Sequence, residues 1–429
     1  MKEIRLALLG FGSANRALAQ MLLDKSEEDD SGRQCLQVPA SESLTSKLIP
    51  WKVVCIITRR HGSIYASYST ASEINLQGAL ERIGAGGILD ASLVRNTNEV
   101  TQSASCTAIT TTDATIKLLN ELGHSQAANI VVEAIPSNHK SNGEPAISFI
   151  RTALQAGMHV ASANKCPLAH SRNNIETYFE LQEAAKKNGK LYLHESAVMD
   201  GVPIFSLWNN ALPSVKCRKI RGLLNSTTTM ILSRMEGNIA EVVESNGLVE
   251  HVSETFEDAL EASKQMGIVE EDESLDIDGI DAAMKLRALC VFLSSPAHLS
   301  SSSEHITRIP ALEDISRDSI GQIDSEILCT EYRTSRKRLR SVASAELIEL
   351  PSDPTQGRHH PIQSWKMNVT NEFLSPSDPL HGLNGTSSSV QFCTDVMGPI
   401  SIVSSDPTLT DTAYGLFADI VRIASQAHA

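Results

Sequence analysis

Hydrophobic and polar positions at the start of the chain predict a strand, a tight turn and a helix, in that order. Residues 4–9 form an apolar run, Gly10 and Gly12 follow it, and residues 16–23 repeat apolar side chains at helical spacing. Gly10 permits a tight turn, Gly12 permits close approach of the backbone to a pyrophosphate, and the helix N-terminus offers unpaired N–H groups. This order favours a nucleotide-binding unit over a turn of purely structural role.

The turn continues into the first residues of the helix. We expect Ser13, Ala14 and Asn15 to complete the nucleotide-binding turn, because their N–H groups open the helix. Asn15 occupies the place where a third glycine or an alanine is usual in this fingerprint. We therefore expect looser packing of the helix on the strand.

A second strand-like run ends without the acidic residue that usually accompanies NAD. Residues 51–58 are apolar and β-branched, and Arg59 and Arg60 follow directly. An Asp or Glu at this place holds the ribose 2′-hydroxyl of NAD, whereas a guanidinium group suits the 2′-phosphate of NADP. The sequence favours NADP over NAD, and two solvated surface arginines are the alternative interpretation.

Strand and helix patterns then alternate along the chain. The predicted strands are 129–136, 159–163 and 190–194, and the predicted helices are 146–156 and 175–188. Alternation implies a parallel sheet with right-handed crossovers, whose ligands lie beyond the carboxyl ends of the strands. Asn164 and Lys165 end the second of these strands and so belong beside the cofactor cleft. The polar residues 24–47 predict a surface insertion.

The pattern changes past Leu168. Helical spacing dominates residues 228–300, alternating strand-like runs occupy 365–402, and an amphipathic helix covers 413–427. The basic run 333–338 is short, and we interpret it as a solvated face or a loop.

We predict an α/β protein of two domains. The first is an N-terminal Rossmann dinucleotide-binding domain of residues 1–168, rejoined by a terminal helix within 404–429. The second is an α+β catalytic and dimerisation domain of residues 169–403.

Composition and charge narrow the classes of partner. The 429 residues suffice for two or three domains, and the 41% apolar and 21% charged content is typical of a globular protein. Basic residues number 37 and acidic residues 51, so the formal net charge of −14 argues against non-specific nucleic-acid binding. The eight cysteines form no C-x-x-C pair, and Cys55 and Cys290 lie in apolar runs that predict buried reduced thiols.

Membrane and targeting signals are also missing from the sequence pattern. No apolar run reaches the length needed to span a membrane, so we expect no membrane partner. The first strand begins too close to Met1 to leave room for a signal peptide. We therefore expect a cytoplasmic location.

The most specific segment is a loop dense in carboxylates. A helix predicted at 256–266 ends at Gly267, the acidic loop follows, and a second helix begins near Gly279. On that helix Asp281 and Lys285 lie four residues apart, within salt-bridge reach. Because the helix is apolar almost all round, we expect this pair to be buried and functional, the alternative being an exposed pair of little consequence.

This loop resembles the signature of the homoserine dehydrogenase family: an apolar residue and Glu before an acidic loop, then Asp, Gly, Asp and a helical Lys. Further blocks that resemble the same family are 162–165 with 167–169, 222–227, 195–198 with Gly201 and Pro203, and the terminal helix after Thr412 and Ala413 that contains Asp419. The resemblance covers residues 1–300 in order, together with the end of the chain.

The resemblance implies an NADP-dependent oxidoreductase that interconverts L-aspartate 4-semialdehyde and L-homoserine, in threonine and methionine biosynthesis. It implies that Glu270 and Asp276 hold the amino group of this small amino-acid substrate. It also implies that Asn225, Ser226 and Thr227 supply N–H and hydroxyl donors to the substrate carboxylate.

The same resemblance assigns the catalytic and cofactor groups. Lys285, oriented by Asp281, and Lys165 would flank the reacting oxygen, where an ammonium stabilises a developing alkoxide. The implied cofactor-binding residues are Gly10, Gly12, Ser13, Ala14, Asn15, Arg59, Arg60, Asn164 and Lys165.

A cation and a dimer are the last implications of the resemblance. Glu195, with the backbone carbonyls of Val198, Asp200 and Val202, resembles the family's site for sodium or another monovalent cation, and an unoccupied loop is the alternative. The sheet of the second domain would form a homodimer. We expect neither an aspartate-kinase segment before Met1 nor a regulatory ACT domain after Ala429.

Several positions depart from the family pattern. Ser226 and Thr229 stand where Gly and Asn are usual, and residues 199–200 and 404–407 replace glycine-rich stretches. These changes keep two alternatives open. One is a related dehydrogenase with another small amino-acid or aldehyde substrate, and the other is an NADP-binding regulatory protein without turnover.

Overall fold

The computed structural model describes residues 1–40, 45–66, 72–96, 111–172, 175–236, 254–269, 272–295, 307–351 and 362–427. They form two units. The first unit comprises Met1–Asn209 and Thr408–Ala429, and the second unit comprises Asn210–Pro407.

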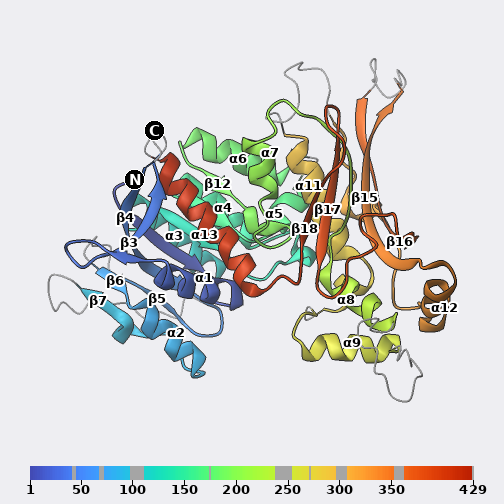
Figure 1. Ribbon diagram of the computed structural model, residues 1–429. Coiled ribbons are helices and arrows are strands. Elements are labelled where there is room, and N and C mark those ends of the chain that lie inside the picture. The colour runs from blue at the N-terminus through green and yellow to red at the C-terminus, as the bar shows by residue number, and fades with distance from the viewer. Residues whose placement is uncertain are drawn as a thin grey trace. The chain divides into compact units, whose positions relative to one another are not determined.

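An eight-stranded sheet forms the centre of the first unit, in the order β12-β9-β8-β1-β4-β3-β2 with β5 paired to β4 (Figure 1). The parallel strands are β1 (Ile4–Leu9), β4 (Ser46–Ile57), β8 (Ile130–Glu133), β9 (His159–Ser162) and β12 (Tyr192–Leu193). The antiparallel strands are β2 (Glu27–Glu28), β3 (Gln34–Pro39) and β5 (Ser63–Tyr65). The predicted parallel sheet is confirmed.

Helices cover both faces of this sheet (Figure 1). Helices α1 (Ser13–Asp24) and α13 (Leu409–Gln426) lie side by side on one face. The other face carries α3 (Thr112–His124), α4 (Ala146–Gln155) and α6 (Thr177–Lys187). Apolar residues of α13 at helical spacing, Leu416, Ile420 and Ile423, join the same core as Leu8 and Leu18.

Smaller elements complete the first unit. They are β6 (Ser72–Ile74), α2 (Leu76–Gly84), β7 (Val94–Asn96), α5 (Cys166–Ala169), β10 (Ser171–Arg172), β11 (Ile175–Glu176), α7 (Ile204–Asn210) and the 3₁₀ turn η3 (Glu195–Ala197).

Two expectations for this region differ from the structure. The predicted surface insertion at 24–47 contains β3, whose Leu36 and Val38 are buried in the core, because alternation of apolar and polar residues gives this strand one covered face. The predicted boundary at residue 168 lies well inside the first unit, since β12 pairs with β9 in its sheet.

A six-stranded, mostly antiparallel sheet forms the second unit, in the order β14-β16-β15-β13-β17-β18. Its strands are β13 (Cys217–Leu223), β14 (Ser316–Arg317), β15 (Arg338–Leu350), β16 (Ile362–Leu374), β17 (Ser388–Thr394) and β18 (Ile400–Ser404). Its helices are α8 (Ser226–Met235), α9 (Phe256–Gln265), α10 (Ser274–Ile277), α11 (Ile280–Leu293) and α12 (Ser325–Ser335). Helix α11 packs on β15 and β16, and Trp365 on β16 donates a hydrogen bond to Ser294 Oγ at 2.9 Å.

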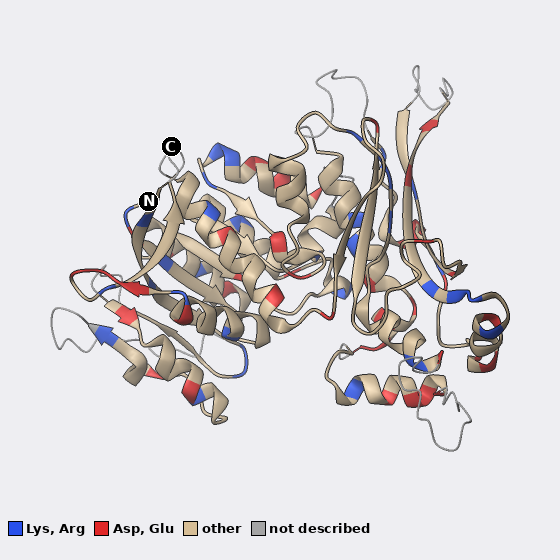
Figure 2. Ribbon diagram, viewed as in Figure 1, with Lys and Arg blue, Asp and Glu red and all other residues tan. Residues whose placement is uncertain are grey.

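The basic run at 333–338 joins α12 to β15 (Figure 2). Arg333, Arg336 and Lys337 are exposed, in agreement with a solvated segment. Two residues further on, Arg340 is fully buried within β15. This strand was not predicted, because its first residues are basic.

Two further observations concern the described part of the chain. None of its helices combines the length and the apolar character needed to cross a membrane. Its cysteines are free thiols, and Cys55 and Cys290 are buried as predicted.

Candidate functional site

The glycine turn after β1 has the backbone that a pyrophosphate requires. Gly10 has φ +82°, and a Cβ at that position would lie 2.6 Å from the Ala134 carbonyl oxygen, so a side chain is excluded. Gly12 has no atom within 4 Å of the position that a Cβ would occupy. Within the described part of the chain, no side chain caps the first N–H groups of α1, which begins at Ser13. This open, uncapped helix end fits the diphosphate of a dinucleotide.

The Asn15 side chain stabilises this turn by hydrogen bonds. Its side chain is fully buried, and Nδ2 donates hydrogen bonds to the carbonyl oxygens of Leu9 at 3.2 Å and Gly10 at 2.7 Å. The amide therefore ties α1 to the end of β1, where we expected looser packing. Ala14, beside it, is half-buried.

Arg59 and Arg60 lie at the same edge of the sheet. Both side chains are exposed, and one residue, Thr58, separates them from the end of β4. The Gly10 N–H donates to the Ile57 carbonyl at 2.9 Å, which joins the glycine turn to the end of β4. The two arginines thus follow the strand that adjoins the nucleotide turn, and their contact with NADP stays a prediction.

A buried carboxyl group organises the segment that carries Asn164 and Lys165. Glu133, at the end of β8, accepts hydrogen bonds from Ser162 Oγ at 2.6 Å, the Ile135 N–H at 3.0 Å and Asn164 Nδ2 at 3.4 Å. Burial raises the pKa of Glu133, although these donors oppose the shift. Lys165 directly precedes α5 and is half-buried. Glu133 was not among the predicted site residues. The sequence feature that could have identified it is a single acidic residue at the end of an otherwise apolar strand.

The Glu195 side chain, predicted to bind a monovalent cation, is already engaged. Its carboxylate accepts hydrogen bonds from the N–H groups of Phe205 at 2.9 Å and Ser206 at 3.1 Å, which open α7. It also accepts one from the Arg422 guanidinium at 2.6 Å. An N-terminal helix end and a guanidinium already neutralise this carboxylate.

The other predicted cation ligands also differ from a cation site. The Val202 carbonyl accepts a hydrogen bond from the Ile204 N–H at 2.7 Å, and the Asp200 carboxylate accepts one from Thr412 Oγ1 at 2.8 Å. Val198 is fully buried. Because Arg422 pairs with the Glu195 carboxylate and the Val202 carbonyl already has a protein donor, these two oxygen ligands fit the predicted sodium site poorly.

In the second unit, Asn225 links the two acidic residues of the candidate substrate site. Its Nδ2 donates to Asp276 Oδ1 at 2.7 Å and to Asp281 Oδ2 at 3.0 Å. Its Oδ1 accepts from the Thr228 N–H at 2.7 Å and so caps α8. We predicted that Asn225 would serve the substrate carboxylate, but its amide spans the two acids, both buried. The Asn225 side chain thus links Asp276, Asp281 and the start of α8, and its role toward the substrate carboxylate stays a prediction.

Lys285 is held in one place by two oxygen atoms. Its Nζ lies 2.8 Å from Asp281 Oδ2 and donates to the Leu224 carbonyl at 2.9 Å. The Lys285 side chain is 20% exposed, whereas that of Asp281 is 4% exposed. The predicted i,i+4 pair is thus a partly buried ion pair.

Ser226 and Thr227 open α8 beside these acids. Thr227 Oγ1 donates to the Ile268 carbonyl at 2.9 Å, so its hydroxyl is engaged. Their two N–H groups make no hydrogen bond among the described residues, because the cap reaches Thr228. Glu270 lies outside the described residues.

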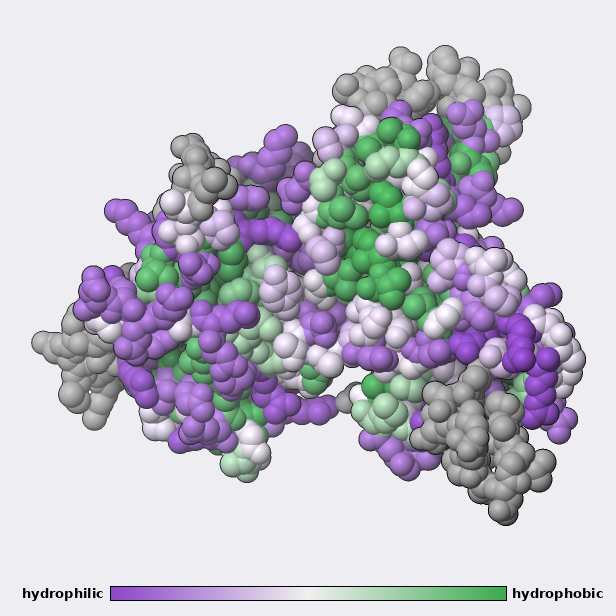
Figure 3. Space-filling model, viewed as in Figure 1, coloured by the Kyte–Doolittle hydropathy of each residue, from purple (hydrophilic) through white to green (hydrophobic). Residues whose placement is uncertain are grey.

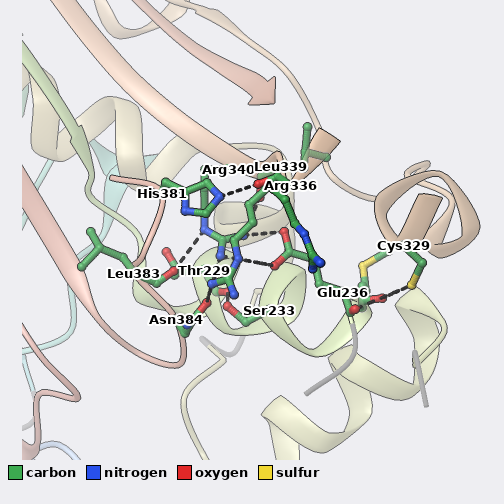
Figure 4. Close-up of polar contacts among 12 residues, drawn as sticks. Thr229, Ser233, Glu236, Cys329, Arg336, Leu339, Arg340, His381, Leu383 and Asn384 are labelled. Atoms are coloured by element: carbon green, nitrogen blue, oxygen red, sulfur yellow. Dashed lines mark hydrogen bonds and ion pairs between the residues drawn. The ribbon is translucent and has the colours of Figure 1, made fainter. Parts of the chain in front are cut away.

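The far end of α8 is fixed by a buried ion pair (Figure 4). Arg340 donates from Nη1 to Glu236 Oε1 at 2.7 Å and from Nη2 to Asn384 Oδ1 at 3.0 Å. Both charged side chains are buried, and Glu236 directly follows α8. The helix that presents the candidate site is therefore held at both ends.

Known proteins resemble the chain over most of its length. A family model described as homoserine dehydrogenase matches residues 203–421. An NAD(+)-dependent homoserine dehydrogenase of Pseudomonas canavaninivorans is 26% identical over 426 residues, which is 99% of this chain and 97% of the relative. A homoserine dehydrogenase of Methanocaldococcus jannaschii is 28% identical over 298 residues, 69% of this chain and 73% of the relative.

Solved structures share the fold. The structure of a putative homoserine dehydrogenase from Archaeoglobus fulgidus has a TM-score of 0.65 at 21% identity and covers 98% of this chain and 99% of that one. A hyperthermophilic archaeal homoserine dehydrogenase in complex with NADPH has a TM-score of 0.63 at 23% identity, with 98% of both chains covered. The predicted α/β fold class is confirmed.

Proposed function

Because the chain belongs to the homoserine dehydrogenase family and is an NAD(P)-dependent oxidoreductase, we propose that it interconverts L-aspartate 4-semialdehyde and L-homoserine with NADP. The observation that carries this proposal is the Lys285 ammonium, held 2.8 Å from Asp281 beside a second buried acid. A fixed ammonium next to a carboxylate suits an amino-acid substrate whose reacting oxygen gains negative charge.

The second unit offers a partner for each charged end of the substrate. Asp276 supplies a carboxylate for the substrate ammonium, and Asn225 holds that carboxylate in place at 2.7 Å. The N–H groups of Ser226 and Thr227 at the start of α8 suit the substrate carboxylate, because a helix N-terminus attracts anions. Glu270 stays a predicted second ligand of the ammonium.

Lys285 supplies charge and a proton at the reacting oxygen. The nicotinamide, when bound, donates or accepts the hydride. Lys285 Nζ stabilises the alkoxide and passes a proton to or from it, while Asp281 keeps the ammonium oriented. Lys165, which directly precedes α5 in the first unit, stays a predicted catalytic residue, and the loss of activity expected in Lys165→Met tests it.

The test is nicotinamide reduction by the purified protein with NADP and L-homoserine. We expect Lys285→Met to lower kcat/KM by at least about a hundredfold, as for loss of a charge that stabilises the transition state. Lys264→Met is the matched control, because Lys264 forms an exposed ion pair with Glu273 on the surface of the same unit. Tight NADPH binding without turnover would support the regulatory alternative, and turnover of a different hydroxy amino acid would support a related dehydrogenase.

Cofactor choice rests on Arg59. Its exposed guanidinium after β4 suits the 2′-phosphate of NADP. The relative named as NAD(+)-dependent favours NAD instead. We expect Arg59→Ala to raise KM for NADP about tenfold, because one charge-assisted contact with the 2′-phosphate is lost. KM for NAD, which has no 2′-phosphate, should stay unchanged. Equal effects on the two nucleotides would contradict the NADP assignment.

The sheet of the second unit supports a homodimer. Apolar side chains gather over β17 and β18 (Figure 3), and Val396, Met397 and Val403 are exposed there. Strand β18 is also an edge of the sheet, with backbone groups that can pair with a second copy. Val403→Lys should convert the dimer to a monomer in light scattering, and a wild-type monomer would contradict the proposal.

We also propose a cytoplasmic location. The described cysteines are free thiols, which is usual in reducing compartments. Cell fractionation with an antibody to the native chain tests it.

A further inference from the structure

The loop at residues 195–204 is joined to α13 by hydrogen bonds along its length. The Glu195 N–H donates to Asp419 Oδ2 at 2.8 Å, and Ser196 Oγ donates to the Thr412 carbonyl at 2.7 Å. Thr412 Oγ1 in turn donates to Asp200 Oδ1 at 2.8 Å. Loop and helix therefore behave as one structural piece within the first unit.

Close backbone packing reinforces this attachment. A Cβ at Gly201 would lie 2.1 Å from the Asp411 carbonyl oxygen, and one at Gly415 would lie 2.3 Å from Ser196 Oγ. Neither position accepts a side chain. The loop and α13 are in direct contact here, so protein atoms fill the space between them.

Arg422 supplies the positive charge at the loop's buried carboxylate. The Glu195 side chain is 2% exposed, and Arg422 Nη1 lies 2.6 Å from its Oε2. The same nitrogen lies 3.3 Å from Asp419 Oδ1. A sodium or potassium ion beside Glu195 would have to sit next to this guanidinium, and like charges at such separations repel.

From these contacts we propose that Arg422 takes the place of a monovalent cation in this chain, so that the loop at 195–204 keeps its structure without a bound ion. The guanidinium neutralises Glu195, and the hydrogen bonds to α13 fix the backbone that an ion would otherwise hold. This inference concerns the first unit alone and does not depend on the substrate.

The first experiment compares salts on the wild-type protein. Thermal unfolding is measured in sodium chloride, potassium chloride and choline chloride at equal ionic strength. We expect the three Tm values to agree within about 1 °C, because an ion that binds only the folded state would raise Tm with its concentration. Selective stabilisation by sodium or potassium over choline would overturn the proposal.

The second experiment removes the guanidinium. In Arg422→Met the Glu195 carboxylate is left buried without its cationic partner. The N–H groups of Phe205 and Ser206, which donate hydrogen bonds to this carboxylate, should then exchange their hydrogens with solvent faster. We expect at least about a tenfold increase in hydrogen exchange for peptides that contain these amides. Arg33→Met is the control, because Arg33 is 62% exposed in its pair with Asp29.

Unchanged exchange in Arg422→Met would overturn the proposal, because the loop would then not depend on the guanidinium. If that variant does not fold, Arg422→Lys keeps the charge and should retain wild-type protection of Phe205 and Ser206 in choline chloride. Failure of a folded Arg422→Lys to retain this protection, whether or not sodium is added, would also overturn the proposal. Both readouts are independent of turnover, so they separate this inference from the proposed reaction.

Discussion

In the first unit the candidate nucleotide turn consists of backbone groups, whereas in the second unit the candidate substrate site consists of charged side chains. Gly10 and Gly12 leave the first N–H groups of α1 open. Asp276, Asp281 and Lys285 instead meet through the amide of Asn225. A backbone site needs only a short contiguous segment, but a side-chain site depends on every element that holds its members in place.

The contrast predicts different responses to mutation. Changes in the turn should affect ligand binding with little effect on folding, provided that the backbone conformation is allowed. Changes around α8 should affect stability and activity together, because Asn225 and Glu236 anchor its two ends.

The largest effect on stability is expected from Arg340→Met. It leaves the Glu236 carboxylate buried without its partner, and breaking a buried pair in this way costs about 3–5 kcal/mol. Urea unfolding measures the loss. Lys264→Met, which removes an exposed pair, should change stability by less than about 1 kcal/mol. An equally small change in the stability of Arg340→Met would show that the Glu236–Arg340 ion pair does not stabilise the far end of α8.

Asn225→Ala should lower kcat/KM by about a hundredfold, equivalent to about 2.7 kcal/mol. The bridge between Asp276 and Asp281 is lost, and the two carboxylates then repel each other. Asn75→Ala is the matched control, since Asn75 caps α2 of the first unit through the Gly78 N–H in the same way. Equal activity in the two variants would contradict the positioning role.

Gly12→Ala should raise KM for the nucleotide about tenfold, near 1.4 kcal/mol, with Tm unchanged. The added methyl group meets no atom of the described residues within 4 Å but lies where a pyrophosphate would approach. Gly10→Ala should instead destabilise the fold, because its φ is positive and the Ala134 carbonyl lies 2.6 Å away. If Gly12→Ala bound the nucleotide as wild type does, the turn would not be the binding site.

The smallest change in stability at neutral pH is expected from His159→Asn. Burial, with the nearby Lys190, lowers the pKa of His159 to about 4, and its Nδ1 accepts a hydrogen bond from the Leu191 N–H at 3.1 Å. The unfolded chain binds the proton near pH 6.5, so wild-type stability should fall as the pH falls from about 6.5 to 4.

Asn at position 159 keeps an acceptor for the Leu191 N–H but cannot titrate. As the pH falls through this window, the Tm of the variant should therefore decrease less than that of the wild type, whereas the two Tm values should agree near pH 7. Parallel pH profiles would mean that His159 does not contribute to acid sensitivity.

Sequence patterns could predict the elements whose signals are local. The turn at Gly10 and Gly12, the apolar strands β8 and β9, and helix α11 are confirmed close to their expected positions. The same holds for the Asp281–Lys285 pair, because four residues along a helix fix the geometry.

Contacts between distant segments could not be predicted in this way. Glu195 and Arg422 are 227 residues apart, and Glu236 and Arg340 are 104 apart. Each pair is set by how elements pack, not by spacing along the chain. Strand β15 was missed for a related reason, since its basic start suggested solvent whereas Arg340 is buried against Glu236.

The position of α13 in the first unit has a consequence for biosynthesis on the ribosome. Leu416, Ile420 and Ile423 complete a core shared with Leu8 and Leu18. The part of this core that lies before residue 210 must therefore wait for α13, whereas the segment between them, Asn210–Pro407, can fold before α13 emerges. A nascent chain arrested before α13 would carry an uncovered apolar surface and would be a target for chaperones.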